Sequence, residues 1–111
     1  MHQGAIIVNA SKNLSNFKHI VFNNEAHDSV GSQPTAINIA SLDKIALNSG
    51  YKKAYFVSTK NELEQILPEF INDKCTSLLE IKVKCGARDD LGRPKEKPVE
   101  NKELFMEFLN D

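Results

Sequence analysis

Short apolar segments that suit β-strands alternate along this chain with segments whose apolar residues recur at helical spacing. This alternation limits the folds that the chain can adopt. Segments 17–23, 53–58 and 76–84 are short and rich in β-branched and aromatic residues, which is typical of strands. Segments 41–50 and 59–71 carry apolar residues at helical spacing. Strands that alternate with helices predict a parallel sheet with right-handed crossovers. We therefore expect an α/β fold, a partial parallel sheet with flanking helices.

The two central helices carry boundary signals. Ser41 is a plausible N-cap of the first, and Gly50 suits the position just after its last turn. Thr59 and Glu62 have the spacing of a capping box at the start of the second. Pro68 lies inside this second helix and lacks an amide hydrogen, so it is expected to kink or shorten the helix.

The strands differ in their expected exposure. Segment 17–23 is apolar at consecutive positions, which suits a strand covered on both faces. In segment 76–84 the apolar residues alternate with Glu80, Lys82 and Lys84, which predicts an edge strand with one wet face. Three strands are few for a doubly covered sheet, which usually has about five or six. The chain therefore resembles part of a larger domain.

The two ends of the chain are less regular. Residues 1–11 are compatible with a helix, although Gly4 and the β-branched residues after it oppose one. Segment 85–100 is polar and rich in glycine and proline, which indicates a loop or an extended arm. Asn101 is a candidate cap for a last short helix. The residues expected to bury one side of that helix are Leu104, Phe105 and Phe108.

Composition excludes several classes of partner. The 111 residues suffice for one domain with a modest core. A net charge of -1 gives no reason to expect nucleic acid or an anionic membrane as a partner. No apolar segment approaches the roughly 18 residues of a membrane span, and no signal peptide is recognisable. Cys75 and Cys85 lack CxxC spacing, so we expect free thiols in a reducing cytoplasm.

A dense group of polar residues follows the first strand, in the sequence IVFNNEAHDSVGSQPT (20–35). In open parallel sheets, ligands bind beyond the carboxyl ends of the strands. Asn24 offers a side-chain oxygen and the following turn offers carbonyl oxygens, which are ligands that Mg²⁺ accepts. Glu25 and Asp28 are close in sequence, but a residue beside a ligand usually points elsewhere. The alternative is that Asn23 and Asn24 only end the strand in an Asx turn.

Other residues of this stretch have two readings as well. His27 could exchange a proton near neutral pH or orient a substrate carboxylate, or it could be a loop histidine bonded to the backbone. Gly31 would let the backbone approach a ligand closely. The hydroxyl and amide side chains that could bind phosphate or phosphonate oxygens, or be ordinary turn residues, are Ser29, Ser32, Gln33 and Thr35.

The remaining histidines and arginines give weaker signals. His2 and His19 have no partners at recognisable spacing and are expected to be structural. Arg88 or Arg93 could present a guanidinium to an anion. The alternative is an exposed arm with local ion pairs, which contribute little.

Two stretches together resemble a known family. The sequences NNEAHDSVGSQPT and GARDDLGRPKEKPVENKELFMEFL are similar to the C-terminal part of the phosphonopyruvate decarboxylases, which are thiamine-diphosphate enzymes close to the sulfopyruvate decarboxylases. The resemblance covers nearly the whole chain. It implies a fold of three α/β domains, of which the last binds the cofactor diphosphate through Mg²⁺. Residues 1–111 would then be the C-terminal part of that diphosphate-binding domain.

The resemblance also implies roles for particular residues. Asn24 would be a side-chain ligand of Mg²⁺ and Ala26 a backbone ligand. His27 is the candidate catalytic residue. The residues that would border the cofactor and substrate are Glu25, His27, Asp28 and Ser29. The implied cofactors are thiamine diphosphate and Mg²⁺, and the implied substrate is a small 2-keto acid, 3-phosphonopyruvate in preference to sulfopyruvate.

This sequence departs from the family pattern in one important respect. The family holds Mg²⁺ partly through the aspartate of a Gly-Asp-Gly triplet, which occurs nowhere in this sequence. We therefore expect an incomplete piece of a decarboxylase that is inactive alone. Two alternatives remain: a small subunit that completes its site with another chain, and a non-catalytic α/β interaction module. The complete family enzyme is expected to be at least a dimer, or to take its pyrimidine-binding domain from another chain.

Overall fold

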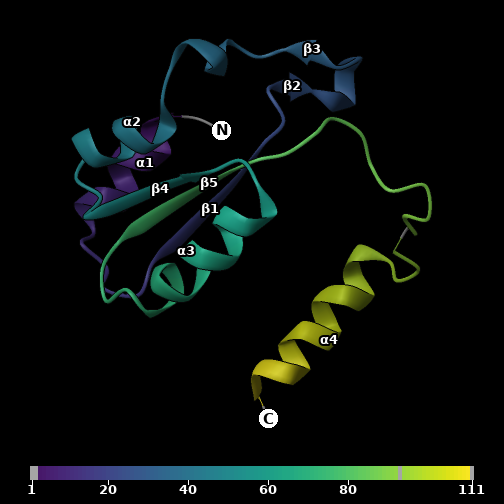
Figure 1. The fold of residues 1–111 in the computed structure, drawn as a ribbon. Coiled ribbons are helices and arrows are strands. Elements are labelled where there is room, and N and C mark those ends of the chain that lie inside the picture. Colours follow the sequence, from purple (N-terminus) through teal and green to yellow (C-terminus); the bar gives the residue numbers. More distant parts are fainter. Residues whose placement is uncertain (1–2, 93, 111) are drawn as a thin grey trace.

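A small parallel sheet forms the centre of the protein. The computed structural model describes residues 3–92 and 94–110. Strands β1 (Lys18–Asn23), β4 (Lys53–Val57) and β5 (Ser77–Lys82) are hydrogen-bonded in the order β1-β5-β4, and both pairings are parallel. Figure 1 shows this sheet with helices on both sides. The α/β fold with a parallel sheet and flanking helices is therefore confirmed.

Helices cover the two faces of the sheet unequally. Helices α1 (Gln3–Ser11) and α2 (Leu42–Asn48) lie on one face, and α3 (Lys60–Asn72) lies on the other (Figure 1). Leu78 and Leu79 of β5 are both fully buried because successive strand residues point to opposite faces. The cluster around Leu78 contains Ile6, Ala46 and Tyr51, and the cluster around Leu79 contains Val57 and Phe70.

Strand β5 is the central strand, so its assignment to a sheet edge was wrong. Glu80, which suggested a wet face, is only 5% exposed. Its carboxyl group accepts a hydrogen bond from the side-chain amide of Asn23 on β1, with 2.7 Å between Nδ2 and Oε1. Burial of a polar group is tolerated when the group is hydrogen-bonded. At Glu80 the alternation therefore marked a buried polar contact, whereas Lys82 and Lys84 beyond it are exposed as expected.

Strand β1 is covered on one face only, contrary to the expectation from its apolar run. Val21 packs against the cluster around Leu78, whereas Ile20 is 44% exposed and Phe22 is 71% exposed on the face toward α3. Within the described residues, β1 pairs only with β5, and its other edge has no strand beside it. An apolar run predicts that a strand will be buried, but the elements that cover it come from elsewhere in the tertiary structure.

Most of the helix-boundary signals are confirmed. Ser41 occupies the N-cap position of α2 without a side-chain cap bond, and Gly50 follows the helix with φ +110°. The capping box at the start of α3 is present, because Thr59 Oγ1 accepts from the Glu62 amide and Glu62 Oε2 accepts from the Thr59 amide. Pro68 does not shorten α3, because the helix continues beyond the proline to Asn72.

A small hairpin leaves the carboxyl end of β1. Strands β2 (Ala26–His27) and β3 (Gln33–Pro34) pair antiparallel around the 3-10 turn η1 (Asp28–Val30). A second 3-10 turn, η2 (Ala36–Ile39), leads back to α2. Figure 1 shows this hairpin beyond the end of the sheet, away from the helical layers. The polar stretch of the sequence is therefore brought to the edge at which parallel strands present their carboxyl ends.

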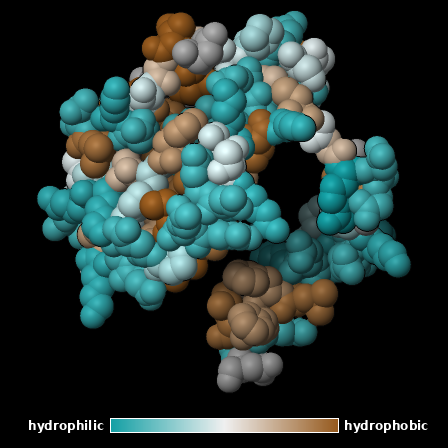
Figure 2. Space-filling model, viewed as in Figure 1, coloured by the Kyte–Doolittle hydropathy of each residue, from teal (hydrophilic) through white to brown (hydrophobic). Residues whose placement is uncertain are grey.

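The last helix begins earlier than expected and is not buried. Helix α4 (Pro98–Asn110) starts before Asn101, and the amide of Lys97 donates to the Glu100 side chain at its start. Figures 1 and 2 show α4 at the end of a long arm, with apolar residues gathered on its surface. The expectation that its apolar side is buried was wrong, since Phe108 is 74% exposed.

The remaining expectations concern membrane spans, histidines and arginines. Within the described residues, no helix combines the length and hydropathy needed to cross a bilayer. His19 is structural as expected, with 3.0 Å between its Nδ1 and the Tyr51 hydroxyl. His2 and Arg93 lie outside the described residues. Arg88 forms an exposed ion pair with Asp90, at 3.0 Å, which agrees with the reading of this segment as a solvated arm.

Candidate functional site

The asparagine pair ends β1 in two overlapping turns. Asn23 Oδ1 accepts a hydrogen bond from the amide of Glu25, at 2.9 Å, and Asn24 Oδ1 accepts one from the amide of Ala26, at 3.1 Å. Each side chain therefore caps the backbone two residues later, which is the Asx geometry. Glu25, which follows the asparagine pair, has φ +57°, a left-handed conformation that non-glycine residues rarely adopt. The strand thus stops abruptly, and the chain turns into the hairpin.

The amino group of each asparagine donates to a carboxyl group. Asn23 Nδ2 lies 2.7 Å from Glu80 Oε1, and Asn24 Nδ2 lies 2.7 Å from Asp28 Oδ2. These contacts fix both ends of each carboxamide. Because the amino end of each group is held by an acid, the oxygen end faces the backbone of the turn.

A cavity of about 510 Å³ lies beside this turn. The predicted residues Asn24, Ala26, His27 and Thr35 all line it. Within the described residues, the hydroxyl oxygen of Thr35 is buried and has no hydrogen-bond partner. Buried polar groups are usually hydrogen-bonded, so this oxygen is suited to a ligand in the cavity. The rest of the lining is mainly apolar: Val21, Phe22, Asn23, Ala36, Ile37, Ile39, Ala40 and Leu42.

Other predicted residues lie outside this cavity. Glu25 lines a second cavity of about 280 Å³ and forms an ion pair with Lys82, at 3.1 Å. Ser29 is exposed in η1 and lines neither cavity. Ser32 donates its hydroxyl to Asp28 Oδ1, at 3.0 Å. Gly31 has φ +83°, so its role is to permit the turn.

The loop after β5 also contributes to the site, which sequence reasoning missed. The thiol of Cys85 donates to the Asn24 carbonyl, at 3.3 Å, and the amide of Gly86 donates to Asp28 Oδ2, at 3.3 Å. The Gly86 hydrogen bond is the main cause of the lowered pKa of the Asp28 carboxyl, followed by that from Ser32. More than 50 residues separate this loop from the asparagine pair, so nothing in the sequence indicated that the two segments are neighbours. Gly86 itself was the only residue that indicated a turn at this position.

The oxygen atoms at the turn suit a hard cation that is bound together with an anionic ligand, such as a phosphate group. Among the described residues, no group of three His, Cys, Asp or Glu side chains is placed to hold a metal ion. The neutral oxygens at the turn are those of the backbone carbonyls and of the Asn24 carboxamide, which accepts one hydrogen bond from the Ala26 amide and keeps a second lone pair. Mg²⁺ is often held by few protein ligands together with phosphate oxygens. The site therefore fits a Mg²⁺–phosphate group better than the bare ion.

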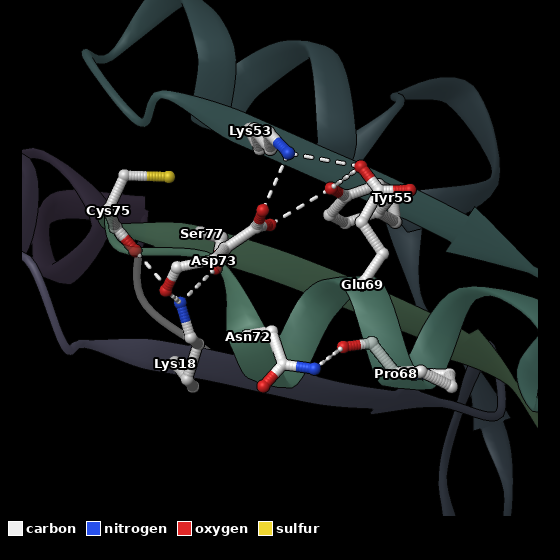
Figure 3. A network of polar contacts seen from close by, with 9 residues as sticks. All are labelled: Lys18, Lys53, Tyr55, Pro68, Glu69, Asn72, Asp73, Cys75 and Ser77. Carbon is white, nitrogen blue, oxygen red and sulfur yellow. Dashed lines mark hydrogen bonds and ion pairs between the residues drawn. The ribbon is translucent and has the colours of Figure 1, made fainter.

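A second polar cluster lies at the opposite, amino end of the strands (Figure 3). Asp73 accepts from Lys53 and Tyr55, and Glu69 accepts from the same two residues. Lys18 donates to the carbonyls of Asp73 and Cys75 and to the Ser77 hydroxyl. These contacts join the end of α3 to all three strands, and neither cavity borders them. We interpret this cluster as structural.

Comparisons with known proteins agree with the family resemblance. No protein-family model matches the sequence. The phosphonopyruvate decarboxylase of Streptomyces viridochromogenes is 28% identical over 109 residues, which are 98% of this chain and 28% of that protein. The phosphonopyruvate decarboxylase of Streptomyces hygroscopicus is 27% identical over 111 residues, which are 100% of this chain and 28% of that protein. The chain is a distant homologue of these proteins and spans about 28% of their length.

Proposed function

We propose that this chain provides part of the metal–diphosphate site of a thiamine-diphosphate-dependent decarboxylase. The proposed parent reaction converts 3-phosphonopyruvate to phosphonoacetaldehyde and CO₂. The observation that carries the proposal is that Asn24, Ala26 and His27 line one cavity at the carboxyl end of a parallel sheet. The distant homology to phosphonopyruvate decarboxylases supports the choice of substrate. Residues 1–111 then correspond to the C-terminal part of the diphosphate-binding domain.

Two oxygen atoms would hold the metal. The Asn24 side-chain oxygen and the Ala26 carbonyl are hard, neutral donors, and Mg²⁺ accepts such ligands. The unpartnered Thr35 hydroxyl, buried against the same cavity, can donate to an anionic oxygen there. Thiamine diphosphate, when bound, supplies the electron sink for the carbanion that loss of CO₂ leaves.

His27 is the residue proposed to act on the substrate. It lies at the rim of the cavity and is exposed, so it can reach both the cavity and solvent. An imidazole can donate a proton or a hydrogen bond to the substrate carboxylate near neutral pH. Ser29 follows in the next turn and Glu25 precedes it, so both border the site without lining the cavity.

The uncovered face of β1 supports completion of the site by further polypeptide. Parallel sheets are normally covered on both faces, yet Ile20 and Phe22 are exposed beside a free strand edge within the described residues. A self-contained interaction module would be expected to cover this face. The alternative that this observation favours is a subunit of the sulfopyruvate decarboxylase type, which completes its site with another chain.

Calorimetry tests the proposed site. Purified chain is titrated with thiamine diphosphate in excess Mg²⁺, and the same titration is made with Asn24→Ala and with Asn61→Ala as a matched control on the exposed side of α3. We expect weak, Mg²⁺-dependent heat that saturates and that only Asn24→Ala abolishes. Heat of equal size in Asn24→Ala, or saturating heat without Mg²⁺, would overturn the assignment of Asn24 as a metal ligand.

A direct assay separates binding from catalysis. The purified chain with thiamine diphosphate, Mg²⁺ and 3-phosphonopyruvate is expected to release no CO₂, because the two proposed ligands carry no charge to hold the metal firmly. Release of CO₂ above a cofactor-only control would show that this chain forms a complete site. The His27→Gln variant would then test whether the histidine takes part.

A further inference from the structure

The carboxylate of Asp28 joins three segments around the asparagine turn. Its Oδ2 accepts from Asn24 Nδ2, at 2.7 Å, and from the amide of Gly86, at 3.3 Å. Its Oδ1 accepts from the Ser32 hydroxyl, at 3.0 Å. All three partners are donors, so this carboxylate has little capacity left for a cation. It acts as an anchor for the turn and not as a ligand.

An anchor of this kind determines the orientation of a carboxamide. The two ends of an asparagine side chain have nearly the same shape but opposite hydrogen-bonding character. An ionised carboxylate can only accept, so the Asn24 amino group must face Asp28. The Asn24 oxygen is then directed to the opposite side, where it meets the amide of Ala26. A rotated carboxamide would place two oxygens against each other and would lose both hydrogen bonds.

The loop after β5 holds this anchor in place. The amide of Val83 donates to the Asn23 carbonyl, at 3.0 Å, which continues the β1–β5 ladder. Cys85 and Gly86 then contact Asn24 and Asp28. Gly86 has φ +99°, and a Cβ there would meet no atom within 4 Å, so glycine is required for the backbone conformation and not for space. The turn of β1 is therefore held by the neighbouring strand.

We propose that Asp28 is a positioning residue, which orients the Asn24 carboxamide so that its oxygen faces the cavity side of the turn. Glu80 holds the amino group of Asn23 in the same manner. The significance of this orientation for metal binding rests on the proposed function. The orientation of the Asn24 carboxamide does not depend on the proposed function, and it can be measured without a cofactor.

Nuclear magnetic resonance of the ¹⁵N-labelled chain tests the proposal. The Asn24 side-chain signals are identified by their loss in Asn24→Ala. In the wild type they should be displaced from those of exposed Asn61, because one proton is donated to a carboxylate. In Asp28→Ala they should move to the position of the Asn61 signals. In Asp28→Asn they should move only partway, since an amide still bonds but accepts either orientation.

Controls separate positioning from general damage. Asp89→Ala removes an exposed carboxylate from the same region and should leave the Asn24 signals unchanged. The urea midpoint of Asp28→Ala should fall only slightly, because Ser32 and Gly86 are exposed and can donate to water when the carboxylate is removed. Asn24 signals that are unchanged in both Asp28 variants would overturn the proposal.

Cofactor titration gives the functional consequence. Residues that orient a metal ligand typically contribute about 10–100-fold to metal affinity, so Asp28→Ala should weaken the Mg²⁺-dependent binding of thiamine diphosphate by about that factor. Unchanged affinity in Asp28→Ala would contradict the positioning role. Absence of heat in the wild type would contradict the ligand role of Asn24, whereas the resonance experiment would still decide the role of Asp28.

Discussion

Asn23 donates its side-chain amide to the buried carboxyl group of Glu80 on the neighbouring strand, with 2.7 Å between Nδ2 and Oε1. Glu80 is the strand partner of Val21, so Asn23 reaches back along the sheet by two residues to make this contact. The hydrogen bond joins the last residue of β1 to the central strand. It therefore connects the start of the candidate site to the most buried part of the fold.

Replacement of Glu80 should destabilise the protein. In Glu80→Leu the half-buried amino group of Asn23 loses its acceptor. An unsatisfied donor costs about 1–3 kcal/mol when it is fully buried, so the loss here should lie at the lower end of that range. Glu80→Gln keeps an acceptor oxygen and should lose less. Urea unfolding followed by circular dichroism measures both. The double variant Asn23→Asp/Glu80→Leu is the control, because aspartate keeps an oxygen that can accept from the Glu25 amide but has no amino group. It should recover part of the loss if the unpaired amide is the cause.

The capping box of α3 gives a prediction about local stability. Thr59→Ala removes the hydroxyl that accepts from the Glu62 amide, and loss of such a cap typically costs about 1 kcal/mol. Thr59→Ser keeps the hydroxyl and should have a small effect. The thermal midpoint is the measurement. Equal destabilisation by serine and alanine would assign the effect to the lost methyl group.

Stability should fall as the pH drops below neutrality because of His19. Burial lowers the pKa of His19 below its ordinary value of about 6.5. The unfolded chain therefore binds a proton before the folded chain does, so the contribution of His19 is complete above that value and is lost as the pH falls toward the folded-state pKa. His19→Gln cannot titrate, so its urea midpoint should change less between pH 7.5 and 5.5. An identical change in the variant would exclude His19 as the cause.

The cluster in Figure 3 predicts that the stability of the protein also depends on pH in a more acidic range. Burial acts to raise the pKa of Asp73, but hydrogen bonds from Lys53 and Tyr55 outweigh it, and the pKa is lowered. Its contribution is therefore present above the ordinary value of about 3.9 and lost as the pH falls through the folded-state pKa. Asp73→Asn should be less stable at pH 7 and should lose less stability between pH 5 and 3.

Tyr55 reports on the same cluster directly. Burial, followed by the hydrogen bonds to Asp73 and Glu69, raises the pKa of Tyr55 to about 12. Burial also raises the pKa of Tyr51, so an ultraviolet titration is made in the wild type and in Tyr55→Phe, and the difference between them reports Tyr55. Tyr55 should ionise well above the ordinary value of about 10, and its ionisation should move toward lower pH in Asp73→Asn. If the titration of Tyr55 is the same in both proteins, the contact between the hydroxyl and Asp73 does not form in solution.

The two thiols should differ in reactivity. Cys85 is exposed in the loop over the candidate site, whereas Cys75 is half-buried. Under native conditions, iodoacetamide should therefore label Cys85 first, and mass spectrometry of the digested chain measures the order. In urea the two rates should converge. Faster labelling of Cys75 in the native chain would contradict the exposure described for these residues.

Several features could be predicted because their causes are local. The capping box of Thr59 and Glu62 depends on residues three apart, and the strand-helix alternation depends on the spacing of apolar side chains. The turn at Asn24 was also predictable, since an Asx turn involves only the residue and its near neighbours. Its two readings, a strand end and a ligand position, do not exclude each other, because a carboxamide oxygen that accepts one hydrogen bond, here from the Ala26 amide, keeps a second lone pair.

Other features were not predictable because they depend on which strand lies beside which. Alternation in β5 indicated an edge strand, but the crossover order places it between β1 and β4. The apolar surfaces of β1 and α4 indicated burial, yet Phe22 and Phe108 are exposed. Periodicity identifies the residues that suit a covered face, whereas tertiary contacts decide whether a covering element is present.

The sequence by itself determined the order of the α-helices and of the three sheet strands, the start of α3 and the position of the polar turn, since each follows from interactions within a few residues. The hairpin of β2 and β3 was not predicted. Only the tertiary structure decided how that turn is held. Glu80 meets Asn23, and Gly86 meets Asp28, because β5 lies beside β1 in the sheet. Residues more than 50 positions apart become neighbours through strand pairing, and the orientation of the asparagine pair depends on that pairing.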